Sequence, residues 1–162
     1  MNCDCKIYHY LMYLNAQVDE IVPDKFRIST GPSTCSEPAE LKDINFRRFL
    51  FKEFKCQTDQ LKFVPQNLCT LNEKCYCQYR PYDKTLFVNC SASNLEKAPK
   101  FKEFKNINRI EIFLGQNNLK EIPDMREIGY DLVELLDLSY NSITNITENI
   151  LYGNLKVSKS IY

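Results

Sequence analysis

Hydrophobic and polar positions repeat at a fixed interval in the C-terminal third of the chain. Residues 112–123 read IFLGQNNLKEIP and residues 136–147 read LDLSYNSITNIT, so each matched position lies 24 residues later (136 − 112 = 24). Both segments begin with two apolar residues around one other residue, which predicts a short β-strand whose apolar side chains point inward. An asparagine, Asn117 or Asn141, follows where the chain leaves the strand. Its amide can satisfy backbone groups of its own turn and of the neighbouring turn.

This interval is that of the leucine-rich repeat, whose periods run from about 20 to 29 residues. We therefore predict an α/β solenoid of short parallel strands, with repeats at 100–126 and 127–150 and an incomplete repeat at 151–162. The β-branched and aromatic segment Thr85–Asn89 predicts an earlier strand. The alternative, a set of unrelated amphipathic helices, does not account for asparagines at the same place in both copies.

A second periodicity, that of an α-helix, follows Cys5. Apolar residues recur there at the spacing i, i+3, i+4, i+7 and i+11, which predicts an amphipathic helix over about residues 6–18. This apolar stripe consists of Ile7, Tyr10, Leu11, Leu14 and Val18. We expect a cysteine-stapled domain at 1–64 that contains this helix, because so short a segment rarely builds a sufficient core alone. A second cysteine-rich module is expected at 65–99.

The eight cysteines fall into two clusters of four. An even number in clustered spacing predicts a disulfide framework and an oxidising compartment. Zinc is the alternative, but Cys3-x-Cys5 and Cys75-x-Cys77 each have a single intervening residue, where zinc sites usually have about two to four. The spacing leaves the pairing open, because four cysteines allow three connectivities. The clusters are Cys3, Cys5, Cys35 and Cys56, and Cys69, Cys75, Cys77 and Cys90.

The composition of the chain bears on which kinds of partner it could bind. The chain has 162 residues, of which 44% are hydrophobic, and its 21 Lys and Arg balance its 21 Asp and Glu. A net charge near zero gives no reason to expect nucleic acid or an anionic membrane as partner. No stretch approaches the ~20 apolar residues of a membrane-spanning helix, and the first residues lack the pattern of a signal peptide. Since the cysteines indicate export, we expect this chain to be a piece of a longer protein.

Catalysis has little support in the sequence. His9 is the single histidine, and the chain has neither a Gly-x-Ser-x-Gly motif nor a glycine-rich phosphate-binding loop. A Cys–His pair would need a free thiolate beside the base, whereas every cysteine here has a candidate disulfide partner. We therefore predict that the chain is not an enzyme and holds neither a cofactor nor a metal.

Outward positions of the strands form a candidate protein-binding patch. Phe87 and Phe113 are expected to be cross-strand neighbours, either exposed as an aromatic pair or covered by the neighbouring cysteine-rich module. The candidate protein-binding residues are Phe87, Glu111, Phe113, Leu135 and Asp137. Residues 89–91 (NCS) and 145–147 (NIT) are acceptor sequences for N-glycosylation, at Asn89 and Asn145.

The cysteine clusters and the repeats together resemble a known family. Residues 3–56 resemble the C-terminal cap of extracellular leucine-rich repeat proteins, and residues 69–90 resemble the N-terminal cap. The segment 80–90 (RPYDKTLFVNC), followed by Asn94-Leu95 and Pro99, looks like the second N-terminal cap of insect-type Toll receptors. The resemblance covers about residues 2–157.

The resemblance implies a receptor ectodomain in which one solenoid closes with a C-terminal cap and a short second solenoid begins. It implies protein recognition at the extracellular side of the cell membrane, in innate immunity or development, with a membrane helix and a signalling domain downstream. A Spätzle-like cystine-knot cytokine is the implied ligand of the full receptor. Ligand contacts in that family lie mainly on the longer solenoid, so contact with a receptor dimer partner is a further candidate role. The implied disulfides are Cys3–Cys35, Cys5–Cys56, Cys69–Cys77 and Cys75–Cys90.

The sequence departs from this family in three ways. The gap between Cys69 and Cys75 is longer than usual, no proline follows Cys69, and the first helix has tyrosines where tryptophan is common. The alternative family is the secreted or matrix-attached adhesion and guidance group, which is Slit-like. Its N-terminal cap usually has a shorter segment before the fourth cysteine than residues 78–89 here, which favours the Toll group.

Overall fold

The computed structural model of the chain describes residues 3–14, 34–37, 39–43, 52–58, 74–101, 104, 106–144 and 156–157. Contacts between Cα atoms divide the chain into two units. The first unit comprises Met1–Gln57 and Arg80–Asp83, and the second comprises Thr58–Tyr79 and Lys84–Tyr162. The boundaries expected from the sequence for the caps and repeats stay predictions.

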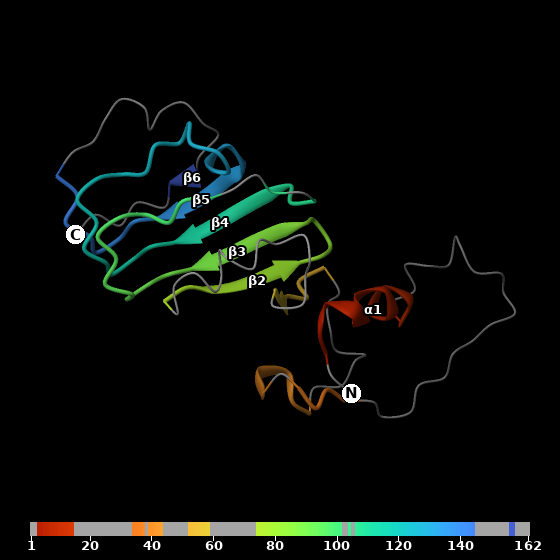
Figure 1. Ribbon diagram of the computed structural model, residues 1–162. Coiled ribbons are helices and arrows are strands. Elements are labelled where there is room, and N and C mark those ends of the chain that lie inside the picture. The colour runs from red at the N-terminus through yellow and green to blue at the C-terminus, as the bar shows by residue number, and fades with distance from the viewer. Residues whose placement is uncertain are drawn as a thin grey trace, which may run out of the picture. The chain divides into compact units, whose positions relative to one another are not determined.

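A short helix begins the first unit. The 3-10 helix η1 (Cys5–Ile7) leads directly into α1 (Tyr8–Leu14), near the N-terminus in Figure 1. Ile7 and Leu11 carry the apolar stripe inward, and Leu11 is completely buried. The helix predicted over residues 6–18 is therefore present as far as Leu14, and residues 15–18 lie outside the described part of the chain.

Two disulfides tie this helix to later segments of the first unit. Cys3–Cys35 joins residues 32 apart, and Cys5–Cys56 joins residues 51 apart. The short elements η2 (Ala39–Leu41) and β1 (Cys56–Gln57) belong to these later segments. Because a cross-link constrains the unfolded chain more as its loop lengthens, both bonds stabilise a unit with little regular structure.

The turn Arg80–Asp83 also belongs to the first unit. The Asp83 carboxylate accepts hydrogen bonds from Arg80 Nε at 3.0 Å and Nη2 at 2.7 Å. Lys52 Nζ lies 5.5 Å from the centroid of the Tyr82 ring, which is within range of a cation–π interaction. Burial, with smaller electrostatic contributions from Tyr82 and Asp83, raises the pKa of the Tyr8 phenol above its ordinary value.

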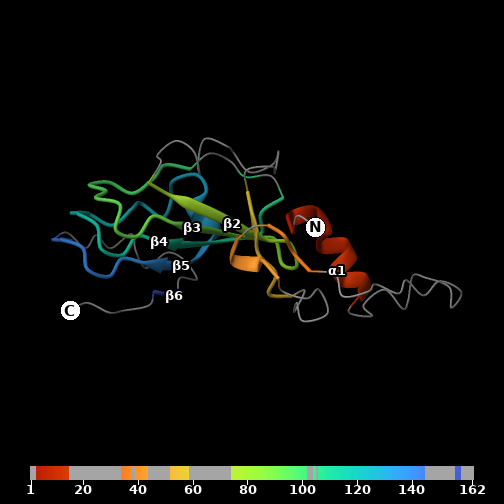
Figure 2. The same cartoon turned by 90° about the horizontal axis from the view of Figure 1, so that it is seen from below.

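Short strands make up most of the second unit. Strands β2 (Tyr76–Arg80), β3 (Thr85–Asn89), β4 (Arg109–Phe113), β5 (Val133–Asp137) and β6 (Lys156–Val157) are neighbours in chain order. Arg80, the last residue of β2, is assigned to the first unit. Strands β3 to β6 are parallel, whereas β2 runs opposite to β3 (Figure 1). The view in Figure 2 shows the same order. This confirms the α/β fold with short parallel strands, including the strand predicted at Thr85–Asn89.

The register between strands contains one irregularity. Strand β3 pairs with β4 at a constant interval, for example Leu86 with Ile110. Between β4 and β5 the interval changes, because Ile110 pairs with Val133 while Glu111 pairs with Leu135. Glu134 is therefore an extra residue in β5, the arrangement of a β-bulge.

Aliphatic side chains fill the interior of the second unit. Inward positions of successive strands stack on one another, and their exposed fractions are at most 1%. These residues are Leu86, Val88, Ile110, Ile112, Leu136 and, directly after β4, Leu114. The alternation predicted from the sequence thus accounts for the core of the sheet.

The connection from β4 to β5 closes the other side of this core. It ends in the 3-10 helix η4 (Tyr130–Leu132), which begins after Gly129 at a φ of 88°. Only glycine adopts this conformation readily, and a Cβ at residue 129 would also lie 2.6 Å from the Phe101 Cβ. The Tyr130 ring packs 4.8 Å from the Phe101 ring, and its hydroxyl donates to the Pro99 carbonyl at 2.8 Å.

Candidate protein-binding face

Alternate side chains of β3, β4 and β5 point away from the core of the second unit. We call this set the outward face. Asn89 and Glu134 are exposed, and the remaining members are half-buried. The outward face consists of Asn89, Arg109, Glu111, Phe113, Glu134, Leu135 and Asp137. It therefore contains four of the five residues that the sequence proposes for protein binding.

Arg109 forms a hydrogen bond and an ion pair at the end of the outward face where the strands begin. Arg109 Nε donates to Thr85 Oγ1 at 2.8 Å, and Arg109 Nη1 lies 3.0 Å from Glu134 Oε2. The bulge in β5 supplies this partner, because it inserts Glu134 beside the start of β4. An exposed ion pair of this kind adds little stability, so its main effect is to hold the guanidinium in place.

The middle row of the sheet corrects one expectation. Phe87 pairs with Glu111, and Glu111 pairs with Leu135, so Phe87 is not the cross-strand neighbour of Phe113. The sequence predicts the two as neighbours because each lies between two inward-facing residues, but the strand register follows backbone hydrogen bonds. Phe87 is also buried, at 6% exposure. It therefore offers little surface to a partner in this structure.

The last row lies where the strands end. Asn89 pairs with Phe113, and Phe113 pairs with Asp137. Asp137 Oδ1 accepts from the Ser139 backbone N–H at 2.9 Å, which fixes the carboxylate at the end of β5. A Cβ on Gly115 would lie 3.1 Å from Asp137 Oδ2 and 2.9 Å from Ser139 Oγ. Glycine at residue 115 therefore lets this carboxylate lie close against the preceding turn.

The chemistry of the outward face is apolar with an acidic balance. Phe113 and Leu135 supply half-buried apolar surface, and Glu111 and Asp137 lie beside them. Arg109 adds a positive charge, but Glu134 offsets it. A face of this composition suits a protein surface that is apolar at its centre and basic at its rim.

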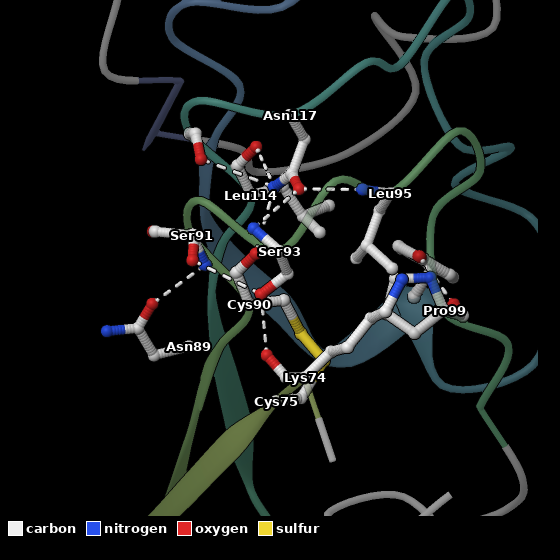
Figure 3. The surroundings of a disulfide bond; sticks show 12 residues. Lys74, Cys75, Asn89, Cys90, Ser91, Ser93, Leu95, Pro99, Leu114 and Asn117 are labelled. Atoms are coloured by element: carbon white, nitrogen blue, oxygen red, sulfur yellow. Dashed lines mark hydrogen bonds between the residues drawn. A yellow bond between two sulfur atoms is a disulfide. The ribbon is translucent and has the colours of Figure 1, made fainter. Parts of the chain in front are cut away.

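A ladder of asparagine hydrogen bonds supports the turns behind this face. Asn117, 5% exposed, accepts at Oδ1 from the backbone N–H groups of Ser93 and Leu95, at 3.0 and 2.9 Å. Its Nδ2 donates to the carbonyls of Cys90 and Leu114, each at 2.9 Å (Figure 3). One side chain thus satisfies backbone groups of two consecutive turns, which would be costly to bury unpaired.

Asn141 repeats this arrangement one turn later. Its Oδ1 accepts from the Leu119 N–H at 3.0 Å, and its Nδ2 donates to the Leu114 carbonyl at 2.8 Å and to the Leu138 carbonyl at 3.1 Å. Ser93 occupies the corresponding place one turn before Asn117 (117 − 93 = 24). Its Oγ lies 2.6 Å from the Lys74 carbonyl, so a shorter side chain ends the ladder against the cysteine-rich segment.

The chain is similar to known proteins over nearly its whole length. No protein-family model matches it. The chain is 29% identical over 154 residues to the protein Toll of Drosophila melanogaster, a match that covers 94% of this chain and 14% of Toll. Two solved structures of the Toll–Spätzle complex also match at 28% identity. The glycosylated form has a TM-score of 0.73 and covers 96% of this chain and 20% of that one, and the other has 0.71, 94% and 19%.

The chain resembles the ectodomain of an insect-type Toll receptor. Sequence and structure agree on this over nearly the whole chain, which confirms the resemblance seen in the cysteine clusters and repeats. The chain spans 14% of the length of Drosophila Toll. It is therefore comparable with one segment of a Toll ectodomain.

The disulfides can be set beside those that the Toll resemblance implies. Three bonds are present between implied partners, including Cys75–Cys90 in the second unit (Figure 3). Cys77 is also disulfide-bonded, and Cys69, its implied partner, lies outside the described residues. The spacing alone left these connectivities open, whereas folding brings the Cα atoms of Cys75 and Cys90 to 4.3 Å from each other.

Of the two glycosylation sequences, the structure describes the one at residues 89–91. Asn89 is the last residue of β3 and is exposed. Its Oδ1 accepts from the Ser91 backbone N–H at 3.0 Å (Figure 3). Asn145 lies outside the described residues, so its acceptor sequence stays a prediction.

Two acidic groups in the connection between β4 and β5 have shifted pKa values. Burial chiefly, and the charge of Glu127 to a smaller extent, raise the pKa of the Tyr130 phenol above its ordinary value of 10.0. Hydrogen bonds from Arg126 lower the pKa of the Asp124 carboxyl to about 2. Neither group lies on the outward face, so both pKa shifts are properties of the repeat connection and not of the candidate site.

The described residues contain neither a metal-binding cluster nor a membrane-spanning helix. In that part of the chain no group of three or more His, Cys, Asp or Glu side chains is arranged to hold a metal ion. Within the same residues, no helix has the length and apolar character needed to cross a membrane. His9, the single histidine, is exposed on α1.

Sequence reasoning missed three features of this Toll-like structure. Strand β2 was not predicted, although Tyr76–Arg80 alternates in burial before a turn at residues 81–84. Ser93 was not recognised as the first member of the ladder, although it lies 24 residues before Asn117. The role of Arg109 was not predicted. Its partner Glu134 lies in a β-bulge, and no local sequence pattern indicates that bulge.

Proposed function

We propose that this chain is an extracellular protein-recognition module of a Toll-type transmembrane signalling receptor, and that its outward face makes the contact. The observation that carries the proposal is the match to Toll over 94% of the chain, together with the match to Toll in its complex with Spätzle. A Spätzle-like protein is accordingly the first partner to consider. The chain itself would act by binding, at the extracellular side of the cell membrane, and catalysis forms no part of the proposal.

The shape of the outward face supports protein recognition. Phe113 and Leu135 are half-buried on neighbouring strands that backbone hydrogen bonds hold in register. Rigid aromatic and aliphatic side chains of this kind lose little conformational entropy when a partner covers them. The flanking carboxylates of Glu111 and Asp137 would favour partners with basic residues at the edge of the contact.

A second copy of the receptor is the other candidate for this face. The chain corresponds to 20% of the solved Toll chain in the glycosylated complex. Other parts of an ectodomain can therefore carry ligand contacts, while this segment contacts a neighbouring receptor. Both versions require the outward face to be a protein contact, and they differ in which protein covers it.

The test uses the secreted ectodomain of Drosophila Toll with its 154 matching residues replaced by those of this chain. We expect Phe113→Ala and Leu135→Ala to weaken either Spätzle binding, measured by surface plasmon resonance, or ligand-induced dimerisation, measured by analytical ultracentrifugation. Truncating a central interface residue typically costs more than about 1 kcal/mol, which is roughly fivefold or more in affinity. Ile128→Ala is the control, because Ile128 is 67% exposed and precedes η4, away from the outward face.

Each result has a clear meaning. A loss of Spätzle affinity assigns the face to the ligand, and a loss of dimerisation at unchanged affinity assigns it to a second receptor. If both variants bind and dimerise like the unchanged chimera and like Ile128→Ala, the outward face is not a protein contact and the proposal fails.

A further inference from the structure

The acceptor sequence at residues 89–91 combines an open amide with a buried cysteine. Asn89 and Ser91 are exposed at the end of β3. Asn89 Oδ1 is bonded to the Ser91 N–H, whereas Nδ2, the atom that would receive a sugar, makes no hydrogen bond within the described residues. In Figure 3 this amide nitrogen points away from the other labelled side chains. The folded geometry therefore leaves room for a glycan on Asn89.

Cys90, the middle residue of this sequence, restricts when a glycan can be added. It is fully buried and disulfide-bonded to Cys75, and its N–H donates to the Phe113 carbonyl at 2.8 Å. Once these bonds form, the backbone of residues 89–91 is fixed against the sheet. A transferase needs an acceptor segment that can extend into its active site, so transfer must precede closure of the Cys75–Cys90 bond.

Closure of the Cys75–Cys90 bond is slow enough to leave time for glycan transfer. Cys75 and Cys90 are 15 residues apart, so synthesis at about 5–20 residues per second separates their emergence by only ~1–3 s. Disulfides form in seconds to hours. Bond closure therefore does not have to precede glycan transfer, and a population of chains should contain both outcomes.

We propose that Asn89 is an N-glycosylation site whose occupancy is set by competition with the Cys75–Cys90 disulfide, and whose glycan covers the last row of the outward face. In the transfer step, Asn89 Nδ2 attacks the anomeric carbon of a lipid-linked oligosaccharide pyrophosphate. The new N–C bond replaces the C–O bond, the lipid pyrophosphate leaves with the electron pair, and one amide proton passes to a base of the transferase.

The position of the glycan follows from the strand register. Asn89 pairs with Phe113, and Phe113 pairs with Asp137, so all three lie in one row at the ends of the strands. A sugar on Asn89 would lie against the half-buried Phe113 ring. The middle row, with Glu111 and Leu135, would remain open to a protein. Glycosylated and unglycosylated chains would thus present different parts of the outward face.

This inference rests on the extracellular route contained in the proposed function, and it does not depend on any ligand. The experiment expresses the full chain behind a cleavable signal peptide in a eukaryotic secretory cell. Occupancy is read by enzymatic deglycosylation in heavy-oxygen water, which marks each released asparagine as labelled aspartate for peptide mass spectrometry. Whole-cell material is used, so a variant that misfolds after transfer still reports its occupancy.

Two variants test the competition. Cys75→Ser leaves Cys90 without its partner, and we expect it to raise Asn89 occupancy roughly twofold or more, because closure of the Cys75–Cys90 bond no longer competes with transfer. Asn145 on the same chain serves as the internal reference, since its acceptor sequence contains no cysteine, and its occupancy should not change. Ser91→Ala removes the acceptor sequence while leaving both cysteines, and it should abolish labelling at residue 89.

A second measurement tests where the glycan lies. Hydroxyl-radical footprinting compares secreted wild-type chain with Asn89→Gln. We expect several-fold weaker labelling of Phe113 in the glycosylated chain and equal labelling of Ile128 in both. Equal labelling of Phe113 would overturn the covering of the last row.

The outcomes separate this inference from the proposed function. Absence of glycan at Asn89 in both wild type and Cys75→Ser overturns the site, whether or not Asn145 is modified. Equal Asn89 occupancy in the two chains overturns the competition. A secreted, oxidised chain modified only at Asn145 would leave the proposed function standing while this inference fails. A chain that stays reduced and unmodified after signal-directed entry would contradict both.

Discussion

Cysteines make up half of the buried apolar side chains in the described part of the first unit, but a small fraction of those in the second. The first unit buries Cys3, Cys35 and Cys56 beside Ile7, Leu11 and Phe54. The second unit instead stacks aliphatic residues from β3, β4 and β5, and an asparagine ladder satisfies the turns between them. The first unit therefore depends on covalent cross-links where the second depends on repeated packing.

The two units differ in their source of stability because only the second has a repeated sequence pattern. A solenoid turn presents the same inward positions every time, so each added turn buries the previous one. The first unit has one short α-helix and no repeated element among its described residues. Long disulfide loops supply the stability that such a segment lacks, because they reduce the entropy of the unfolded chain.

The largest expected effect is loss of the first unit when its longer disulfide is removed. Replacing Cys5 and Cys56 together by serine opens a loop of 51 residues, for which chain entropy gives a cost of about 4 kcal/mol. Hydrogen exchange measured by mass spectrometry should show that residues 3–14 lose protection while residues 107–119 keep theirs. The matched control replaces Cys75 and Cys90, whose 15-residue separation gives about 3 kcal/mol. Equal loss of protection in both units would contradict the division between them.

A cavity made in the second unit should reduce hydrogen-exchange protection there and leave the protection of the first unit unchanged. Ile112 is completely buried between β3 and β5, so Ile112→Ala should destabilise this unit by about 2–5 kcal/mol, and Ile112→Val by about 0.5–1.5 kcal/mol. Urea unfolding followed by tyrosine fluorescence and by hydrogen exchange measures both. Retained protection in residues 107–119 of the alanine variant would show that the stacked core is not the main source of stability.

The ladder should contribute less than the core, and unequally along its length. Asn117 is 5% exposed and joins two turns, so Asn117→Ala should cost about 1–3 kcal/mol by leaving buried backbone groups unpaired. Asn141 is less buried, and Asn141→Ala should cost less. Thermal melting of these variants is compared with that of Asn118→Ala, an exposed neighbour. A melting temperature for Asn117→Ala equal to that of Asn118→Ala would exclude the ladder as a source of stability.

The smallest effect concerns Tyr130 and appears only at alkaline pH. Its pKa is raised in the folded state, so its contribution to stability is complete below the ordinary phenol pKa of 10.0 and is lost as pH rises above that value. Tyr130→Phe removes the hydrogen bond to the Pro99 carbonyl, which should cost about 0.5–1.5 kcal/mol near neutral pH. Urea melts at pH ~8 and ~11 should show a smaller alkaline loss in the variant than in the wild type. An unchanged difference between the two pH values would contradict the raised pKa.

The sequence by itself determined those features that depend on local periodicity. The alternation in Thr85–Asn89 predicts that strand and its inward residues, because side chains of a strand alternate between two faces. The place of Asn117 and Asn141 follows from the 24-residue interval, since every turn of a solenoid needs the same backbone satisfaction. Helix α1 was visible as far as Leu14 for the same reason.

Only the tertiary structure decided how these elements meet. The bulge at Glu134 brings that residue to Arg109, the register separates Phe87 from Phe113, and the fold buries Phe87. The pairing of Cys75 with Cys90 likewise needed the chain to be folded. Each of these depends on residues far apart in sequence, whose alignment is set by backbone hydrogen bonds between strands. Local periodicity carries no information about that alignment, because shifting one strand past another leaves every local pattern unchanged.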